Sequence, residues 1–278
     1  MRIYHYICFN ASPDHVTELE RVGISIKAKN SAAFSVYDDD SRWPEVQCLL
    51  NSWHVKWRDH IEYSDEDLSS SAYLHIIGAP EAAIPHPEKK SGWKAATYDL
   101  SKYCGTCGSH KLQIHPFQLI EAPKFGTDDV VSLYWVYDEY FVRTEIWNRV
   151  FQPFGIESLP VLRHESRLPL ETVVQLKIDD ISQFPLDAGD KWDSSVCAVC
   201  GQKKNCGSPR TPYFPQFVGN PEGHLFKTQE LFGAGLISAR AVVCSNELYR
   251  VMMSAGVRGL KFEPQEMVCT GQTSRGAR

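Results

Sequence analysis

At 278 residues the chain is long enough for one large domain or two of ordinary size, and 43% hydrophobic residues suffice for a packed core. A formal net charge of -5 without an extended basic cluster argues against a general nucleic-acid binder. No secretory signal pattern opens the chain, and no apolar run approaches the roughly 18 residues of a membrane span. Nine cysteines, an odd number, fit a reducing compartment better than a secreted disulfide framework. We therefore expect a cytoplasmic protein that binds neither nucleic acid nor membrane.

The first part of the chain predicts short strands and a short helix. An alternating, aromatic-rich run at residues 2–9 is typical of a strand, and Ser12 followed by Pro13 is typical of a helix start. Gly23 is expected to end that helix. Two further apolar runs, which lead to an acidic turn, predict strand at residues 23–28 and 33–37.

Residues 43–63 show the clearest helical periodicity in the chain, with apolar and aromatic residues at spacings near three and four. We interpret the stripe formed by Trp53, Trp57 and Ile61 as core rather than as a ligand-binding box. The sequence thus predicts one long amphipathic helix here.

A Pro-, Glu- and Lys-rich stretch at residues 80–92 predicts the boundary between two parts. We expect an N-terminal α+β module over residues 1–92, which includes a strand at 73–77, and a second domain over residues 93–278. Within the second domain we predict strands at residues 130–137, 158–162, 168–178, 239–244 and 260–263, helices at 139–151 and 246–255, and a disordered tail at 270–278.

Two segments of the second domain share one order of elements. Residues 136–162 and 242–264 each read as strand, polar cap, helix, glycine at the helix end, and short strand. This order predicts a duplicated strand-helix-strand unit. The expected fold class is α+β, with mixed sheets and flanking helices.

Two copies of one short cysteine motif are the strongest chemical signal, and their sequences are Cys104-Gly-Thr-Cys107-Gly108 and Cys197-Ala-Val-Cys200-Gly201. Two thiolates two residues apart can chelate one ion from a tight turn, and the following glycine permits a positive φ or a close backbone approach. Together the pairs supply the four sulfurs of a tetrahedral structural zinc site. The alternative is that each pair is separate, either without metal or forming a disulfide. His110 and His115 follow the first pair and could replace a cysteine as ligand.

The two motifs lie much further apart than the roughly 15–20 residues that separate the pairs of a compact zinc ribbon. A shared zinc ion would therefore join the two ends of a domain-sized segment. Closing so long a loop restricts the unfolded chain more than closing a short one. We expect the zinc site to clasp the fold of the second domain.

The sequence lacks the common catalytic motifs, including the Walker loop, GxGxxG after a strand, HExxH and GxSxG. Four cysteines would also close the coordination shell, whereas catalytic zinc needs an open position. We therefore do not expect an enzyme. The alternative is a zinc-clasped hydrolase or transferase with an unrecognised active site, which could use His164, Glu165 and Arg167 in one loop.

The second domain resembles the double-CXXCG family, immunity proteins of bacterial polymorphic toxin systems. The resemblance covers residues 93–278 and includes Phe232-Gly233, an element of a wider group of immunity domains. It rests on three stretches in chain order, VVQLKI, CAVCG and HLFKTQELFGAGLISARAVVCSNELYRVMMSAGVRGLKFEP. The family motif carries over to Cys104, Cys107, Cys197 and Cys200 with their two glycines. The resemblance implies an immunity protein that binds a cognate toxin domain and occludes its active site.

The acidic balance suggests how such a protein could bind. Many toxin domains present basic clefts to nucleotides or nucleic acids, and an acidic surface would be attracted to such a cleft. The acidic stretches available for this are residues 38–40, 65–67 and 128–129 together with 138–139. Each stretch on its own is also typical of a solvated turn or a helix cap.

Overall fold

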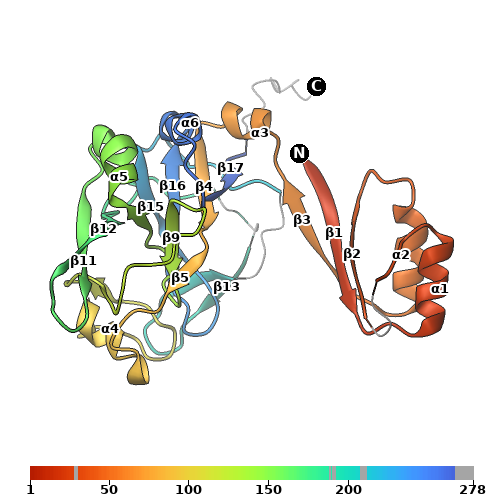
Figure 1. Ribbon diagram of the computed structural model, residues 1–278, viewed down its shortest axis with the longest axis horizontal. Coiled ribbons are helices and arrows are strands. Elements are labelled where there is room, and N and C mark those ends of the chain that lie inside the picture. The colour runs from red at the N-terminus through yellow and green to blue at the C-terminus, as the bar shows by residue number, and fades with distance from the viewer. Residues whose placement is uncertain (28–30, 188, 190–191, 207–211, 267–278) are drawn as a thin grey trace, which may run out of the picture. The chain divides into compact units, whose positions relative to one another are not determined.

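A computed structural model describes residues 1–27, 31–187, 189, 192–206 and 212–266 (Figure 1). The chain divides into two compact units, Met1–Asp67 and Leu68–Arg278. The predicted tail at 270–278 and Cys269 lie outside the described residues. Among the helices of the described ranges, none is both long and apolar enough to cross a membrane.

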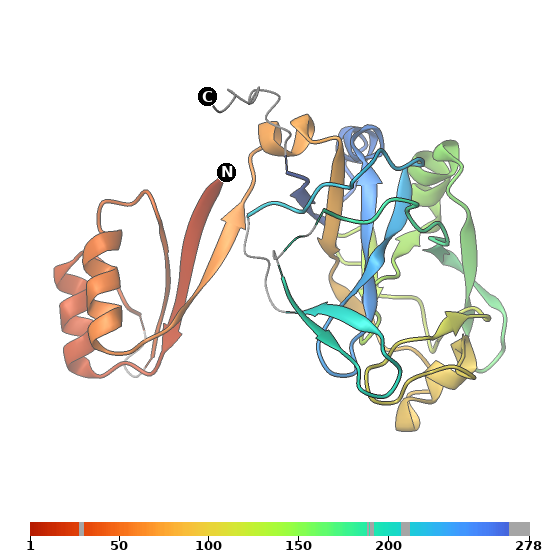
Figure 2. The same ribbon diagram turned by 180° about the vertical axis from the view of Figure 1, so that it is seen from behind.

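The first unit is a three-stranded antiparallel sheet with two helices. Its strand order is β2-β1-β3. The strands are β1 (Arg2–Phe9), β2 (Ala32–Tyr37) and β3 (Trp57–Glu62), and the helices are α1 (Pro13–Arg21) and α2 (Trp43–Ser52). Figures 1 and 2 show the two helices side by side on one face of this sheet. The core between sheet and helices contains Ile7, Leu19, Val46 and Leu50.

Helix α1 begins and ends where the sequence predicts. The Ser12 side chain accepts a hydrogen bond from the His15 backbone N–H, and Pro13 occupies the first turn, where a missing N–H costs nothing. Gly23 has a φ of 80°, a conformation that glycine adopts without a Cβ clash. The predicted strands at 2–9 and 33–37 are confirmed, but residues 23–27 form none.

The predicted helix at residues 43–63 is wrong in its second half. Helix α2 ends at Ser52, and His54 then takes a φ of 57°, which turns the chain into strand β3. The spacing of four between Trp53 and Trp57 imitated a helical face, although the two residues lie on different elements. Both side chains are partly buried against the first unit's core.

The second unit contains two six-stranded mixed sheets and a small ribbon. One sheet has the order β5 (Glu81–Ala83), β9 (Val130–Leu133), β10 (Phe141–Arg143), β12 (Pro169–Leu176), β11 (Ser158–Arg163) and β8 (Gln118–Leu119). The other has the order β13 (Asp193–Val196), β14 (Lys203–Cys206), β15 (Leu225–Phe232), β16 (Ala239–Ser245), β4 (Tyr73–Gly78) and β17 (Lys261–Pro264). The ribbon pairs β6 (Tyr98–Asp99) with β7 (Leu112–Gln113). The α+β class with mixed sheets is confirmed.

The remaining helical elements connect these strands. They are α3 (Asp65–Ser70), η1 (Lys89–Ser91), α4 (Gly92–Thr97), α5 (Thr144–Ile146), η2 (Trp147–Phe151), η3 (Gln152–Phe154) and α6 (Asn246–Ser254). The helix expected at 139–151 starts only at Thr144, because Phe141–Arg143 belong to strand β10. The helix expected at 246–255 is α6, whose N-cap Ser245 accepts a hydrogen bond from Leu248 N–H.

The two units divide earlier than the proline-rich stretch suggests. Strand β4 pairs antiparallel with both β16 and β17, and β5 pairs with β9, so residues 73–83 belong to the sheets of the second unit. The division therefore falls after Asp67 and not at residue 92. Leu74 and Ile76 of β4 are buried in the main core of this unit. A composition shift marks loops, but it cannot show which sheet a short strand joins.

The main core of the second unit packs two helical segments together. Ile146, Val150 and Phe151 come from the α5–η2 segment, and Leu248 and Met252 come from α6. Figures 1 and 2 show α5 and α6 at the same end of this unit. Each helical segment connects two strands of one sheet that have a third strand between them. Strands β10 and β11 lie on either side of β12, and strands β16 and β17 lie on either side of β4. The shared order agrees with the expected pattern, while the duplication itself stays a prediction.

Candidate metal centre

Each CxxC motif lies at the tip of an antiparallel ribbon. Strands β6 and β7 enclose the first motif, and β13 and β14 enclose the second. We call residues 104–108 the first knuckle and residues 197–201 the second. Between the two knuckles run strands β8 to β12, all of which belong to one sheet. The two knuckles therefore meet from opposite ends of a domain-sized segment.

The two knuckles share one backbone conformation. In the first, the Gly108 N–H donates to the Cys104 carbonyl at 2.8 Å and the Cys104 N–H donates to the Ser109 carbonyl at 3.0 Å. The same two bonds, each 2.9 Å long, join Cys197, Gly201 and Gln202 in the second. Both closing glycines have a positive φ, 78° at Gly108 and 72° at Gly201. This turn directs both sulfurs of a knuckle to one side.

The four sulfurs form a compact cluster. All four Sγ atoms lie within 4.8 Å of one another, with Cys104 and Cys197 3.8 Å apart and Cys107 and Cys200 3.5 Å apart. All four are free thiols, so neither pair forms a disulfide, and these two separations are far longer than the about 2.05 Å of a disulfide. An ion bound tetrahedrally to four sulfurs at about 2.3 Å separates those sulfurs by about 3.8 Å. The cluster therefore has a geometry that could hold a metal ion.

Hydrogen bonds prepare two of these thiols for ionisation. Burial opposes the thiolate of Cys107, but the hydroxyl and the backbone N–H of Ser109 lower the pKa of Cys107 to about 6. The backbone N–H groups of Thr106 and Cys107 lower the pKa of Cys104. Since a thiolate is the ligand that a metal ion binds, these bonds favour the binding-competent form of Cys104 and Cys107. At Cys200 a backbone hydrogen bond acts to lower the pKa, but burial and the neighbouring cysteines raise the pKa of Cys200 to about 12.

A loop at residues 233–238, which we call the bracing loop, supports the first knuckle. The Ser238 hydroxyl lies 2.8 Å from that of Ser109, which in turn lies 3.3 Å from the Cys107 sulfur. A Cβ atom built on Gly108 would lie 2.0 Å from the carbonyl oxygen of Leu236. The glycine is thus required both by its φ and by the close approach of this loop.

Lys204 joins the two ribbons and the bracing loop. It lies on β14 just after the second knuckle, and its side chain is 4% exposed. Its ammonium donates to the carbonyls of Cys107, Gly235 and Ile237 at 2.7 to 2.8 Å. The sequence gives no signal of this role, because a lysine in a polar strand is normally exposed.

The other candidate ligands do not join the cluster. Within the described residues, the groups of cysteines, histidines and carboxylates close enough to hold a metal ion are limited to these four cysteines. His110 and His115 are outside it. Cys8, Cys48, Cys206 and Cys244 are free thiols elsewhere, and Cys244 is fully buried.

The residues of the alternative catalytic loop are not assembled as a catalytic group. His164 Nδ1 lies 2.9 Å from Gln118 Oε1, and its ring is 5.5 Å from that of His86. Among the described residues, no hydrogen bond or ion pair joins His164 to Glu165. Arg167 has a φ of 59° at the turn between β11 and β12.

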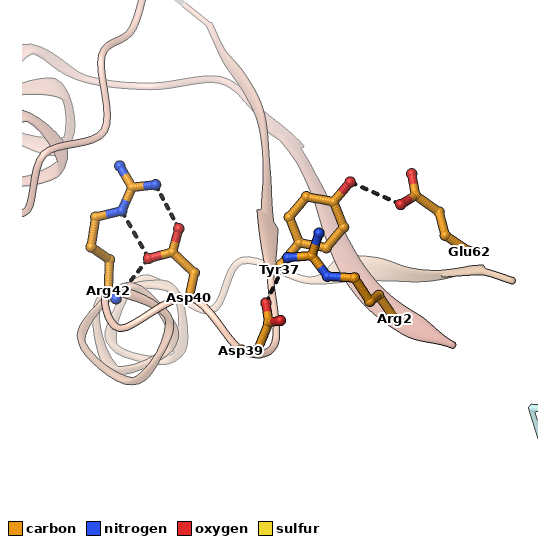
Figure 3. Close-up of polar contacts among 6 residues, drawn as sticks. All are labelled: Arg2, Tyr37, Asp39, Asp40, Arg42 and Glu62. Atoms are coloured by element: carbon orange, nitrogen blue, oxygen red, sulfur yellow. Dashed lines mark hydrogen bonds and ion pairs between the residues drawn. The ribbon is translucent and has the colours of Figure 1, made fainter. Parts of the chain in front are cut away.

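The acidic stretch at residues 38–40 is largely paired within the first unit. Figure 3 shows Arg2 donating to Asp39 and Arg42 donating to Asp40, at distances of 2.9 and 2.6 Å. The hydrogen bonds from Arg42 lower the pKa of Asp40 to about 2. The charges of Asp39 and Asp40 are therefore partly neutralised by Arg2 and Arg42.

Other predicted acidic residues are also engaged. Asp67 accepts from the chain's amino terminus at 2.6 Å, and Asp129 lies 3.5 Å from Arg143. Asp138 and Glu139 are only 9% and 8% exposed, so they do not form the acidic surface expected of them. The acidic surface is smaller than the sequence suggests.

Comparison with known protein-family models and with curated proteins gave no match for this chain.

Proposed function

We propose that the protein is an immunity protein that binds a cognate bacterial toxin domain and occludes its active site, with a structural zinc ion holding its second unit together. The observation that carries the zinc assignment is the cluster of four sulfurs with near-tetrahedral edges. Zinc is the ion that four cysteines on two short knuckles most commonly bind. Four sulfurs close the shell, which suits a structural role and leaves no position for a substrate.

Elemental analysis of protein purified under reducing conditions tests the metal assignment. We expect one zinc ion per chain. Cys197→Ser should release it and lower the melting temperature, while the matched variant Cys206→Ser, on the neighbouring strand, should keep it. Wild-type protein without zinc, or equal metal content in both variants, would contradict the assignment.

An exposed aromatic loop after β9 supports a binding role. Tyr134, Trp135 and Tyr137 are 40%, 46% and 45% exposed, although aromatic side chains are usually buried. Trp135 also has a φ of 65°, a strained conformation that is costly for a bulky residue. Tryptophan and tyrosine dominate the residues that contribute most to protein interfaces. This loop is our candidate contact for the toxin.

The toxin domain encoded next to this chain, where one exists, is the partner to test. We expect a one-to-one complex that protects toxin-exposed cells. Trp135→Asn should weaken binding at least about ten-fold without unfolding the protein, because asparagine tolerates the left-handed backbone. Leu168→Ala, at an exposed apolar residue of another loop, is the control and should bind normally. Full protection by Trp135→Asn would refute the assigned surface, and hydrolase or transferase activity lost on changing His164 would favour the enzyme alternative.

A further inference from the structure

A cavity of about 560 Å³ lies in the second unit, away from the cysteine cluster's ligands. Its walls come from the β6–β7 ribbon and from both six-stranded sheets, through residues such as Tyr98, Glu139, Gln175, Lys227 and Arg240. The volume falls within the range of about 300–1,000 Å³ that is typical of small-molecule sites. Its lining is unusual in combining buried charged groups with a buried phenol.

A buried ion pair forms one wall. The Lys227 ammonium lies 2.5 Å from Glu139 Oε1, and the two residues are only 9% and 8% exposed. Gln175 Nε2 donates to the second oxygen of Glu139 at 2.9 Å. A buried ion pair often stabilises a fold no better than apolar residues of the same volume, so stability alone does not explain it. Burial acts to lower the pKa of Lys227, but Glu139 and Asp138 outweigh it and keep the ammonium charged.

The wall of the cavity also holds hydrogen-bond donors that have no acceptor among the described residues. Tyr98 is 5% exposed, and its hydroxyl has no hydrogen-bond partner in the described part of the chain. Lys227 uses one of its three N–H donors on Glu139, and Arg240 uses Nη1 on the carbonyls of Thr228 and Gln229. No hydrogen bond to described residues involves Arg240 Nη2. Burying the Tyr98 hydroxyl without a partner is unfavourable, and a bound acceptor would offset that cost.

The charged residues of the lining also favour a ligand with acceptor groups. Four basic residues, Lys111, Lys177, Lys227 and Arg240, face three carboxylates, Asp138, Glu139 and Asp179. The lining therefore has one more positive than negative charge, in a chain whose net charge is -5, and Lys177 is already paired with Glu157 and Asp179. Lys111 lies 5.1 Å above the Tyr98 ring, so a second ammonium stands beside the unpartnered phenol.

We propose that this cavity binds a small molecule that carries a carboxylate or phosphate group, with the Tyr98 hydroxyl and the Lys227 ammonium donating to its oxygens. Arg240 and Lys111 add positive charge. The proposal does not rest on the proposed toxin surface, so failure of that surface would leave it standing, and its titrations are made on protein that keeps its metal.

Calorimetric titration of the full chain with acetate, succinate and inorganic phosphate tests the proposal. We expect saturable binding of at least one anion at one site per chain, and the anion that binds separates the carboxylate source from the phosphate source. Tyr98→Phe should weaken this binding about ten-fold or more, because a hydrogen bond to a charged group is lost. It should not lower the melting temperature of the ligand-free protein, since the hydroxyl has no partner to lose.

Tyr140→Phe is the matched control. Tyr140 is also buried, but its hydroxyl donates to the Ile76 carbonyl at 3.1 Å and does not line the cavity. This variant should lose stability and keep its affinity for the anion. Lys111→Gln, at the cavity wall, should weaken binding without unfolding the protein. No saturable binding of any of the three anions, or equal affinity in wild type and Tyr98→Phe, would overturn the proposal and leave water as the occupant.

Discussion

Gly108 and Gly201 allow a direct test of how the first knuckle is held. Both close a CxxC turn, with φ values of 78° and 72°. Alanine at either position is destabilised by about 1–2 kcal/mol, because its Cβ disfavours a positive φ. The surroundings differ, because a Cβ at Gly108 would lie 2.0 Å from the Leu236 carbonyl oxygen, whereas a Cβ at Gly201 would have no atom within 4 Å.

The clash at Gly108 cannot be relieved by rotating a side chain. It is made with backbone of the bracing loop, which Lys204 holds through the Gly235 and Ile237 carbonyls. Forcing this loop away adds an overpacking cost of about 1–3 kcal/mol to the backbone penalty. We therefore expect Gly108→Ala to lower the free energy of unfolding by about 2–5 kcal/mol and Gly201→Ala by about 1–2 kcal/mol.

Urea denaturation at a fixed excess of zinc measures both losses, and competition with a chelator measures the metal affinity of each variant. Gly108→Ala should also bind zinc more weakly, because displacing the loop moves the Ser109–Ser238 contact behind Cys107. Equal losses for the two variants would refute the bracing role of the loop.

Three further substitutions test other parts of the structure. Lys204→Met leaves three carbonyls without their buried donor and should cost about 3–5 kcal/mol in denaturant unfolding. Trp43 is 8% exposed, so Trp43→Ala should lower the free energy of unfolding by about 3–5 kcal/mol. Trp57→Ala should lower it by less, because Trp57 is only partly buried. A larger loss for Trp57→Ala would contradict the packing. Arg42 lowers the pKa of Asp40 from 3.8 to about 2, so the stabilisation is present above pH 3.8 and is lost as pH falls through about 2. The melting-temperature difference between wild type and Asp40→Asn should shrink over that window.

The sequence predicts those features of the fold that local chemistry determines. Ser12 and Pro13 define the start of α1, and Ser245 caps α6, because capping needs only neighbouring backbone N–H groups. The four cysteines were also readable from sequence, since each pair has its own turn and glycine. What the local pattern did not show is that Trp57 lies on a strand, because a spacing of four residues is shared by a helix and by a helix-turn-strand.

Strand β4 shows a second feature that local sequence does not predict, the pairing of distant strands. Residues 73–77 were predicted correctly as strand, but their partners β16 and β17 lie more than 150 residues later. Pairing of this kind depends on long-range packing, which no local window contains. The same holds for the cavity, since Tyr98, Glu139 and Lys227 come from three distant segments and each has an ordinary local interpretation.

The metal centre and the cavity share one element, the β6–β7 ribbon. The ribbon ends in the first knuckle and also carries Tyr98 and Gln113 on the cavity wall. Its strands are only two residues long, so their own hydrogen bonds cannot hold them in place, and the proposed zinc ion would support them. Removing zinc should therefore speed amide hydrogen exchange in the ribbon and loosen the wall that contains Tyr98, while exchange in the first unit stays unchanged. Equal protection of the ribbon with and without chelator would show that the cavity wall is held by packing around Phe117 and Trp93 instead.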